Sequence, residues 1–419
     1  KDNRWDVFYH LSQMRTSLLN WYDFKKNSRM LEIGGGFGAI TGLLCRRCKQ
    51  VVTVEQSERR AAAICQRYKN IENLQVLAGR WADEKVGKNQ FDYIFLNCEE
   101  FFRNDSLSPA DFIEWLKKFK KNLKADGKLL MAVENRYGIK YFCGEEEPKS
   151  GLPFAGINMR EEAASYLCSR GQIVDMVQSA GFPAYKFYYP LPGNQFPQLI
   201  YSDEKLPDTD VCERLVFYYR NRECLLASEK KLYGDLLANN VFPFFSNSFL
   251  IECGEKDDFC SVIYAAVSTD RGRKDSFSTK IYSQGLVKKS ALYPEGKESE
   301  DHIFCNLKEL ESRDIKIVPH QKTEDGLAMP FINSPTCSDY LRRLARKGNK
   351  EEIITLFERL YQAILKSSEH EPESQNQFPL KNEVDCDFGI ILKKAYIDMV
   401  PFNCFFINNE MVFFDQEFV

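Results

Sequence analysis

The sequence predicts an α/β protein in which a doubly wound parallel sheet is followed by an α+β domain of two lobes. Short apolar runs alternate with helical patterns between residues 30 and 133, and such alternation is typical of a parallel sheet. The first run ends in a glycine-rich turn, which permits a tight connection into a helix. After residue 210, strand-like runs come first and helical patterns follow. We therefore expect a first domain over residues 1–205 and a second over 206–419.

The composition bounds the class of protein. A chain of 419 residues is long enough for two or three domains of roughly 150 residues each. Its 57 lysines and arginines against 60 aspartates and glutamates give a net charge of −3, which favours neither nucleic acid nor an anionic membrane as partner. The fourteen cysteines follow no regular spacing, so we expect a reducing, cytoplasmic compartment. No apolar run approaches the roughly 18 residues of a transmembrane segment, and the start at Lys1 indicates a fragment or the loss of disordered residues.

The elements of the first domain follow from the apolar periodicity. Residues 10–24 have the spacing of an amphipathic helix that precedes the first strand. The expected strands are 30–33, 51–55, 74–77, 93–97 and 128–133, and the expected helices between them are 39–48, 58–68 and 109–123. A further helix at 170–180 ends before Gly181, a typical helix terminator. Closing strands are expected at 185–189 and 199–201.

The second domain begins after the polar stretch at 202–210, which is the best candidate for a domain boundary. Successive strand-like runs suggest an antiparallel sheet with hairpins. These runs are 249–252, 261–267 and 277–282, and helical patterns follow at 301–313, 338–347 and 351–368.

The first candidate site is the run Met-Leu-Glu-Ile-Gly-Gly-Gly-Phe-Gly at residues 30–38. It places a strand, a glycine turn and a helix start in the order that a nucleotide-binding crevice requires. An acid, Glu55, stands at the end of the second strand, 21 residues after Gly34. A carboxylate at about this spacing accepts hydrogen bonds from ribose hydroxyls in such folds.

The form E-x-G-x-G-x-G resembles motif I of class I S-adenosylmethionine-dependent methyltransferases, which have a Rossmann-like sheet. The similarity covers about residues 10–200. It implies that the glycine loop contacts the cofactor and that Glu55 holds the ribose. The residues of the motif and its loop are Glu32, Gly34, Gly35, Gly36 and Gly38, and the substrate-side candidates at the fourth strand are Asn97 and Glu99. The family's adenine-binding acid is absent from 78–80, which leaves Asp83 as a displaced candidate. A dehydrogenase is a minor alternative, because Ala39 stands where a dinucleotide motif has its last glycine.

A second resemblance concerns residues 133–144, Val-Glu-Asn-Arg-Tyr-Gly-Ile-Lys-Tyr-Phe-Cys-Gly. This run is similar to a segment of methyltransferase domains fused to glycosyltransferases in bacterial surface-polysaccharide clusters. The resemblance implies a sugar or glycan acceptor and a glycosyltransferase partner. The expected acceptor contacts are Asn135, Arg136 and Tyr137, and the candidate bases for methyl transfer to oxygen are Glu99 and Glu134. The alternative is a structured loop whose aromatic side chains are core and whose charges are solvated.

The second candidate site lies near the end of the chain. Asp398 and Asn403 form D-x-x-x-x-N, and Asp415 and Glu417 form D-x-E twelve residues later. Phosphoryl transfer uses an acid near the attacking hydroxyl and oxygen ligands on Mg²⁺. The spacing resembles aminoglycoside phosphotransferases and choline kinases.

This resemblance implies ATP and Mg²⁺ as cofactors. By it, Asp398 is the catalytic acid, Asn403 and Asp415 are metal ligands, Glu417 is the extra acid, and Lys280 binds phosphate. Tyr396 replaces the usual histidine, and the chain stops at Val419, before a complete helical lobe. A pseudokinase or docking module is the equal alternative.

The leading functional hypothesis is an S-adenosylmethionine-dependent methyltransferase that O-methylates a sugar or glycan in bacterial cell-surface polysaccharide biosynthesis. Two alternatives stay open beside the dehydrogenase. One is a bifunctional enzyme that methylates and phosphorylates a glycan end. The other is a non-catalytic scaffold module of a larger glycosyltransferase.

Overall fold

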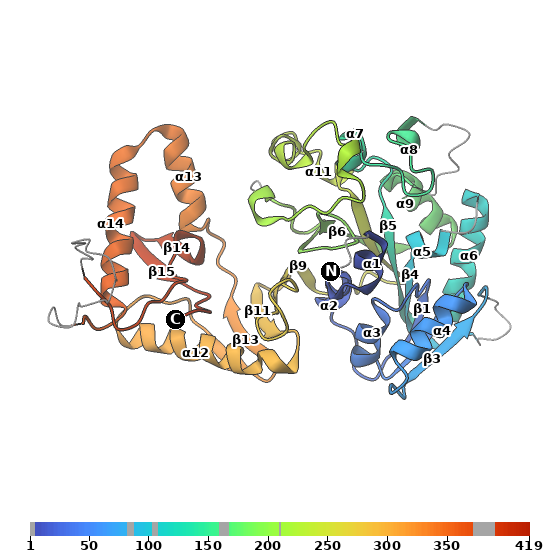
Figure 1. Ribbon diagram of the computed structural model, residues 1–419, viewed down its shortest axis with the longest axis horizontal. Coiled ribbons are helices and arrows are strands. Elements are labelled where there is room, and N and C mark those ends of the chain that lie inside the picture. The colour runs from blue at the N-terminus through green and yellow to red at the C-terminus, as the bar shows by residue number, and fades with distance from the viewer. Residues whose placement is uncertain (1–4, 82–87, 103–107, 159–166, 209–210, 372–389) are drawn as a thin grey trace, which may run out of the picture. The chain divides into compact units, whose positions relative to one another are not determined.

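The chain forms two compact units, shown in Figure 1. The computed structural model describes residues 5–81, 88–102, 108–158, 167–208, 211–371 and 390–419. Unit 1 consists of residues 1–270 and 278–284, and unit 2 consists of 271–277 and 285–419. The units thus divide near residue 270, whereas the sequence suggested 205/206. The reason is that the strands that follow residue 205 join the first sheet.

The first half of the sheet in unit 1 is parallel. Its strands are β1 (Arg29–Ile33), β2 (Gln50–Glu55), β3 (Leu74–Ala78), β4 (Phe91–Asn97) and β5 (Leu123–Glu134). β1 pairs with both β2 and β4, β2 with β3, and β4 with β5, which gives the order β3-β2-β1-β4-β5. All five strands expected here are confirmed. The chain runs from β1 to β2 and β3 on one side and then returns to β4 and β5 on the other side of β1. The carboxyl end of β1 is therefore a topological switch point, where such sheets bind ligands.

The second half of the sheet is antiparallel. Its strands are β6 (Ala184–Leu191), β7 (Leu199–Ser202), β8 (Ser248–Gly254), β9 (Val262–Val267) and β10 (Phe277–Tyr282). β8 lies between β5 and β6, and the order continues β6-β7-β9-β10. The three runs expected as hairpin strands of a second domain are therefore antiparallel strands, but they extend the first sheet. Glu252 of β8 anchors this arrangement, since it accepts hydrogen bonds from the hydroxyls of Tyr22 (2.7 Å) and Tyr188 (3.0 Å).

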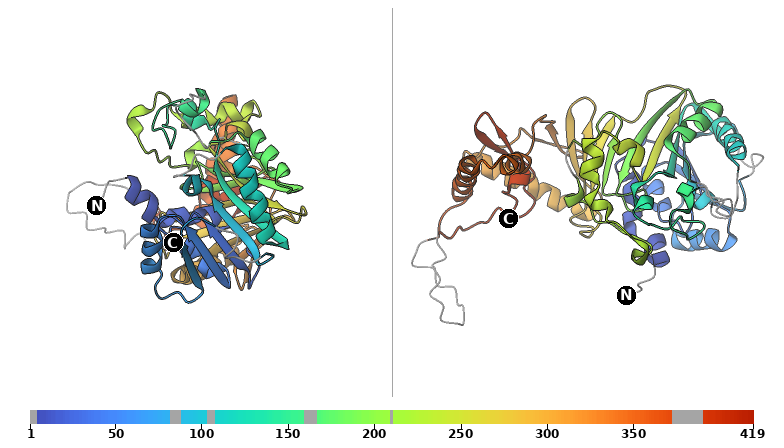
Figure 2. Two further views of the ribbon diagram at one scale, coloured as in Figure 1. Left: turned by 90° about the vertical axis from the view of Figure 1, so that its right-hand side faces the viewer. Right: turned by 90° about the horizontal axis from the view of Figure 1, so that it is seen from above.

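Helices cover the parallel half of the sheet, and Figure 2 gives two further views. The helices of unit 1 are α1 (Trp5–Leu11), α2 (Ser17–Asn20), α3 (Thr41–Arg47), α4 (Glu58–Arg67), α5 (Cys98–Phe102), α6 (Pro109–Asn122), α7 (Ile139–Phe142), α8 (Ala155–Asn158), α9 (Arg170–Ser179), α10 (Tyr233–Ala238) and α11 (Phe242–Phe245). α3 and α4 pack on β2, and α6 packs on β5 and α9. A proline at the first turn and a Ser108 capping box start α6.

The prediction of a single amphipathic helix at 10–24 is wrong. The segment is divided into α1, a 3₁₀ turn (Gln13–Thr16) and α2. Ser12 interrupts the helix, because its backbone is extended and its hydroxyl accepts a hydrogen bond from the N–H of Met14 at 3.2 Å. The apolar spacing was genuine, since Leu18, Leu19 and Trp21 are buried.

Unit 2 contains a short antiparallel sheet, three longer helices and a hairpin. Its strands are β11 (Leu286–Ala291), β12 (Gln321–Thr323), β13 (Gly326–Pro330), β14 (Cys404–Ile407) and β15 (Glu410–Phe413), and its helices are α12 (Lys297–Ser312), α13 (Cys337–Lys347) and α14 (Lys350–Lys366). The three helices expected in this region are confirmed. β13 pairs with β11 and β12, and β14 pairs with β15. Leu310, Leu356 and Phe413 bring α12, α14 and the hairpin into one apolar core.

None of the helices in the described ranges has the combination of length and apolar character that crossing a membrane requires.

Candidate active site

A glycine loop follows β1 at the switch point. The backbone φ angles of Gly34 (+78°), Gly36 (+57°) and Gly38 (+78°) lie in the left-handed region, which L side chains rarely adopt. Gly35 has no room for a side chain either, because a Cβ there would lie 2.4 Å from Cγ2 of Thr53. The loop therefore exposes backbone rather than side chains at the carboxyl end of the strand, as a cofactor cradle requires.

Glu55 lies beside this loop at the end of β2. Its side chain is 3% exposed, and its Oε2 accepts a hydrogen bond from the N–H of Gly36 at 2.8 Å. Its Oε1 accepts from the N–H of Ser57 at 3.0 Å. The structure thus brings together the loop and the acid that the sequence singled out. Asp83, the displaced adenine-side candidate, lies outside the described residues.

A buried arginine that sequence reasoning missed also faces the loop. Arg15 lines the same small cavity as Gly34 and Gly36, together with Asn97 and Glu100. Arg15 is only 5% exposed, and its Nε has no hydrogen-bond partner among the described residues. Its guanidinium lies over the ring of Tyr9, with Cζ 3.9 Å from the ring centroid. A buried cation with an unused donor is suited to bind a carboxylate.

The cavity over the loop is narrow, about 10 Å³. That is about the smallest cavity that can hold one water molecule. Phe37, His10 and Glu100 line the cavity, and Arg60 forms an ion pair of 2.9 Å with Glu100. Entry of a nucleoside therefore requires these side chains to move.

Glu32 supports the loop from below. Its Oε2 accepts hydrogen bonds from the hydroxyls of Thr41 (2.6 Å) and Thr53 (2.7 Å), and the residue is 2% exposed. Burial raises the pKa of Glu32 to about 7, although the two hydroxyls oppose the shift. Through its two hydrogen bonds, Glu32 holds Thr41 and Thr53 in place beside the loop.

We expect the stability of unit 1 to fall as the pH rises from about 4.5 to about 7. Glu32 has an ordinary pKa of 4.5 in the unfolded chain and a pKa of about 7 in the folded chain, so the folded state binds more protons in this window. The difference corresponds to about 3 kcal/mol. Tryptophan-monitored urea unfolding at about pH 5 and about pH 8 measures the change. Other buried acids contribute to the slope, so the wild type is compared with Glu32→Gln, and equal slopes in the two proteins would contradict the assignment.

A second cavity, of about 250 Å³, opens at the carboxyl ends of β4 and β5. Its charged lining residues are Asp6, Glu99, Glu134, Glu145, Glu146, Glu229, Lys140, Lys149 and Arg220. Its aromatic lining residues are Trp5, Tyr9, Phe196, Phe217, Tyr218 and Tyr219. We call it the acid pocket. The acid pocket and the loop cavity share two elements, because Tyr9 and Glu99 line the former while their neighbours His10 and Glu100 line the latter.

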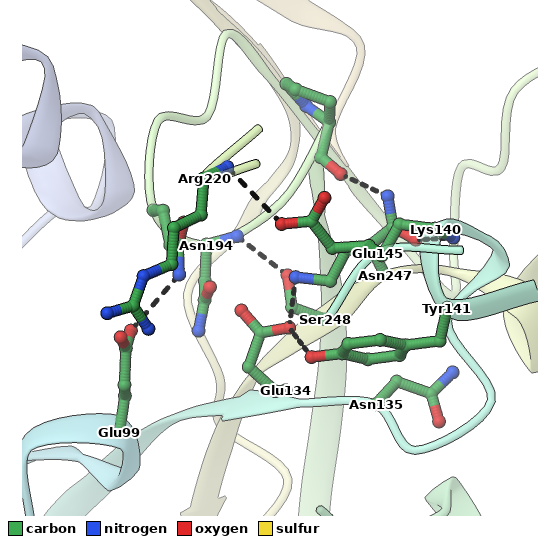
Figure 3. A network of polar contacts seen from close by, with 12 residues as sticks. Glu99, Glu134, Asn135, Lys140, Tyr141, Glu145, Asn194, Arg220, Asn247 and Ser248 are labelled. Carbon is green, nitrogen blue, oxygen red and sulfur yellow. Dashed lines mark hydrogen bonds and ion pairs between the residues drawn. The ribbon is translucent and has the colours of Figure 1, made fainter. Parts of the chain in front are cut away.

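Glu134, the last residue of β5, is a buried carboxylate in the acid pocket. Figure 3 shows it beside Lys140 of α7, with an ion pair of 2.6 Å to Oε2. The hydroxyl of Tyr141 donates to the same oxygen at 3.2 Å. Among the described residues, Oε1 of Glu134 has no hydrogen-bond partner. Burial raises the pKa of Glu134, against the opposing effect of Lys140.

Glu99, the other candidate base, has a different environment. Its Oε2 accepts hydrogen bonds from the hydroxyl of Tyr9 at 2.7 Å and from Nε2 of Gln195 at 3.4 Å. Asn97, at the end of β4, is 7% exposed and lines the loop cavity rather than the acid pocket. Of the three residues expected near the reacting atoms, Glu134 alone combines a position in the acid pocket with a carboxylate oxygen that no described residue contacts.

The three expected acceptor contacts do not line the acid pocket in the described structure. Asn135 is buried and donates to the carbonyls of residues 244 and 246. Arg136 is 8% exposed and donates to the carbonyls of residues 156 and 157. Tyr137 stacks on Phe244, with ring centroids 5.1 Å apart. The polar groups of Asn135 and Arg136 hold neighbouring segments of backbone, and the charge of Arg136 is buried, whereas the structured-loop alternative expected solvated charges.

In unit 2, the structure brings together the residues of the second candidate site. The carboxylate of Asp398 accepts from the N–H groups of Glu417 (2.7 Å) and Phe418 (2.9 Å). The amide of Asn403 donates to the carbonyls of Asp398 and Asp415, both at 3.3 Å. No three His, Cys, Asp or Glu side chains in the described residues gather closely enough to hold a metal ion.

The lysine of this cluster is Lys289, not Lys280. Lys280 belongs to unit 1, where it pairs with Asp23 at 2.6 Å. Lys289 of β11 is buried in unit 2 and pairs with both Asp415 and Glu417. Burial opposes its charged form, but the two carboxylates outweigh burial and raise the pKa of Lys289.

The sequence of this domain was compared with those of known protein families. Residues 31–131 match the model of a methyltransferase domain family. None of the curated proteins matches the sequence. A methyltransferase domain therefore runs from β1 into β5.

Several solved structures are similar to the chain. An S-adenosylmethionine-dependent methyltransferase from Leishmania major has 14% identity and a TM-score of 0.31, and the match covers 42% of this chain and 65% of that chain, less than two thirds of its length. An S-adenosylmethionine-dependent methyltransferase from Archaeoglobus fulgidus has 12% identity and a TM-score of 0.37, with 59% and 96% covered. Phosphoethanolamine N-methyltransferase 1 from Haemonchus contortus, in complex with phosphoethanolamine and S-adenosylhomocysteine, has 14% identity and a TM-score of 0.35, with 58% and 42% covered.

Proposed function

We propose that this chain, which carries an S-adenosylmethionine-dependent methyltransferase domain, methylates a hydroxyl of a sugar or glycan acceptor bound in the acid pocket. The observation that carries the proposal is that Glu134 lines a cavity next to the glycine loop and that its buried Oε1 has no hydrogen-bond partner among the described residues. A carboxylate in that position can take the proton of an acceptor hydroxyl. The rings and hydrogen-bond acceptors around it are the chemistry that binds a sugar.

The residues over the loop have the donors and acceptors that S-adenosylmethionine needs. The backbone of Gly34 to Gly38 can contact its methionine part, the Nε of Arg15 can donate to its carboxylate, and Glu55 can accept from its ribose hydroxyls. When bound, the cofactor supplies a methyl group that its sulfonium already activates. The protein then has to position the acceptor and remove one proton.

The chemistry assigned to the pocket balances with one base. The acceptor oxygen forms a bond to the methyl carbon, and the carbon–sulfur bond breaks with its electron pair remaining on sulfur. The hydroxyl proton passes to Oε1 of Glu134. Lys140 and Tyr141 hold the other oxygen of this carboxylate and fix its orientation.

Binding of S-adenosylmethionine to the glycine loop is the direct test of the proposal. We expect saturable one-to-one binding in a calorimetric titration and no binding of NADH in a parallel run. Replacing Arg15 by methionine removes a charged hydrogen bond to the cofactor and should weaken affinity about tenfold or more. Glu55→Ala should weaken it by a similar factor through loss of the ribose contact.

The control is Glu58→Ala, which removes an exposed carboxylate from the first turn of α4, close to Glu55 in the sequence. Tryptophan-monitored unfolding of each variant separates loss of a cofactor contact from loss of structure. Wild-type protein that does not bind S-adenosylmethionine would overturn the proposed function. Binding of NADH would favour the dehydrogenase instead.

The biosynthetic role and the partner that we propose for this chain rest on the sequence resemblance. We assign the acceptor to bacterial cell-surface polysaccharide biosynthesis, with a glycosyltransferase as partner. A cytoplasmic location is supported by the cysteines, since those in the described residues are free.

Phosphoryl transfer by unit 2 is a second candidate function. The observation that favours it is Lys289, a buried ammonium paired with the two acids of the D-x-E motif. A lysine and two carboxylates in contact are the groups that would separate to hold phosphate and Mg²⁺. The opposing observation is that Asp398 is engaged by the backbone of residues 417 and 418. The alternative is a unit that keeps this cluster for structure alone, and the test is given with Lys289 below.

A further inference from the structure

The deep part of the acid pocket has more carboxylates than cations. Glu134, Glu145 and Glu229 are 2%, 8% and 2% exposed. One ammonium, that of Lys140, lies among them and is 14% exposed. The other two cations of the lining, Lys149 and Arg220, are exposed at the rim. Buried charges that lack a counter-ion are costly, so this arrangement favours a ligand that brings positive charge.

Glu145 also lines the pocket and has a carboxylate oxygen without a hydrogen-bond partner among the described residues. Its Oε1 accepts a long hydrogen bond of 3.4 Å from the backbone N–H of Arg220. Its Oε2 is buried and, like Oε1 of Glu134, has no partner among the described residues. Figure 3 shows the side chains of Glu134, Lys140 and Glu145 directed toward one another. Lys140 is bonded to Glu134, so Glu145 lacks a counter-ion of its own in this group.

Glu229 completes the carboxylate cluster from another segment. Its two oxygens accept hydrogen bonds from the hydroxyl of Tyr219 and the amide of Asn247, both at 2.7 Å. These partners are neutral, so they satisfy its hydrogen bonds without balancing its charge. Burial raises the pKa of Glu229 to about 6 and also raises that of Glu145. A bound cation would favour the charged form of both carboxylates and so oppose the effect of burial.

We infer that the acceptor carries a protonated amino group, which the carboxylate of Glu145 binds while a hydroxyl of the same molecule faces Glu134. An amino sugar has this chemistry. The inference rests on the proposed function and names its substrate class. Trp5, Tyr9 and Tyr218 line the same cavity, and aromatic faces attract ammonium groups as well as sugar rings.

The two carboxylates have separate roles in this assignment. An ammonium has no lone pair, so it cannot accept the methyl group and serves as the handle for recognition. The hydroxyl is the nucleophile, and its proton goes to Glu134. A phosphorylated acceptor fits poorly, because its negative charge would meet the three buried carboxylates.

Calorimetric titration with matched methyl glycosides tests the inference without requiring turnover. The probes are methyl α-D-glucosaminide, its N-acetyl derivative and methyl α-D-glucoside, which differ only at one substituent. Ethanolamine, which has the ammonium and hydroxyl without a sugar ring, shows whether the amine comes from a sugar or a small amino alcohol. We expect the glucosaminide to bind at least about tenfold more tightly than either neutral glycoside, the usual value of a charge-assisted hydrogen bond.

The variant Glu145→Gln keeps the size of the side chain and removes its charge. It should reduce the preference for the amine over the neutral glucoside about tenfold. Glu223→Gln, an exposed carboxylate outside the pocket, is the matched control. Equal affinity for the charged and neutral probes, no binding of either amine, or an undiminished preference in Glu145→Gln would each overturn the inference. Failure of the proposed function shows elsewhere, as a protein that does not bind S-adenosylmethionine.

Discussion

Replacing Glu134 by glutamine is expected to slow methyl transfer about 10²- to 10⁴-fold, the usual contribution of a general base, while S-adenosylmethionine binds with unchanged affinity. Glutamine keeps the shape of the side chain and can still accept from Lys140 and Tyr141, but it cannot take a proton. The measurement is transfer of labelled methyl to the glucosaminide and to the glucoside, with cofactor affinity from calorimetry. Transfer at the wild-type rate would remove Glu134 from the reaction.

Glu99→Gln is the matched variant, because both carboxylates line the same pocket and both were candidates. Glu99 already accepts hydrogen bonds from Tyr9 and Gln195, so its replacement should cost much less than that of Glu134. The pH profile gives a second readout. The base must be deprotonated, so the rate should rise with pH through the raised pKa of Glu134. A positioning role alone would leave this rise intact in Glu134→Gln.

The parallel half of the fold could be predicted from the sequence because its information is local. The apolar runs at 30–33, 51–55 and 93–97 form strands in which nearly every residue is buried. The glycines after the first run and Glu55 after the second occupy strand ends that meet at one edge of the sheet. Their proximity therefore followed once the strands were identified.

The antiparallel half could not be predicted, because its pairing depends on residues far apart in the chain. The run at 249–252 shows a strand but not its neighbours, and in the structure β8 enters between β5 and β6. Glu252 of β8 accepts hydrogen bonds from Tyr22 and Tyr188, which lie far from it in the sequence. Lys280 was wrongly placed in the second domain for the same reason, because a Thr-Lys-Ile pattern on a strand does not show which unit the strand joins.

The residues that form the acid pocket also could not be predicted from the sequence. Glutamate is usually exposed, and only the burial that the structure shows makes Glu145 and Glu229 unusual. Arg15 lies in a segment whose apolar spacing predicted a helix, and no local signal shows that its guanidinium turns toward the glycine loop. The segment 133–144 did indicate the right region, because Glu134 and Lys140 come from it, although its amide and arginine serve the backbone.

Replacing Lys289 by methionine should destabilise unit 2 by about 3 kcal/mol, the lower end of the cost of removing one partner from a buried ion pair. The ammonium is 4% exposed and balances Asp415 and Glu417, which are 28% and 12% exposed. Without it the two carboxylates repel each other, and their partial exposure limits the cost. The four tryptophans precede residue 116 and belong to unit 1. Hydrogen exchange of the α12 amides therefore measures the effect on unit 2 separately.

The matched control is Lys308→Met, which breaks an exposed ion pair with Glu311 on α12 and should cost less than about 1 kcal/mol. The same measurement with MgATP decides the second candidate function. A nucleotide that uses Lys289 and Asp415 should slow exchange in the wild type, where its binding adds to stability by mass action, and should have no effect in Lys289→Met or Asp415→Asn. If MgATP leaves the wild type unchanged while Lys289→Met is still destabilised, the cluster holds unit 2 together and does not bind nucleotide. In that case phosphoryl transfer is removed as a candidate function of unit 2.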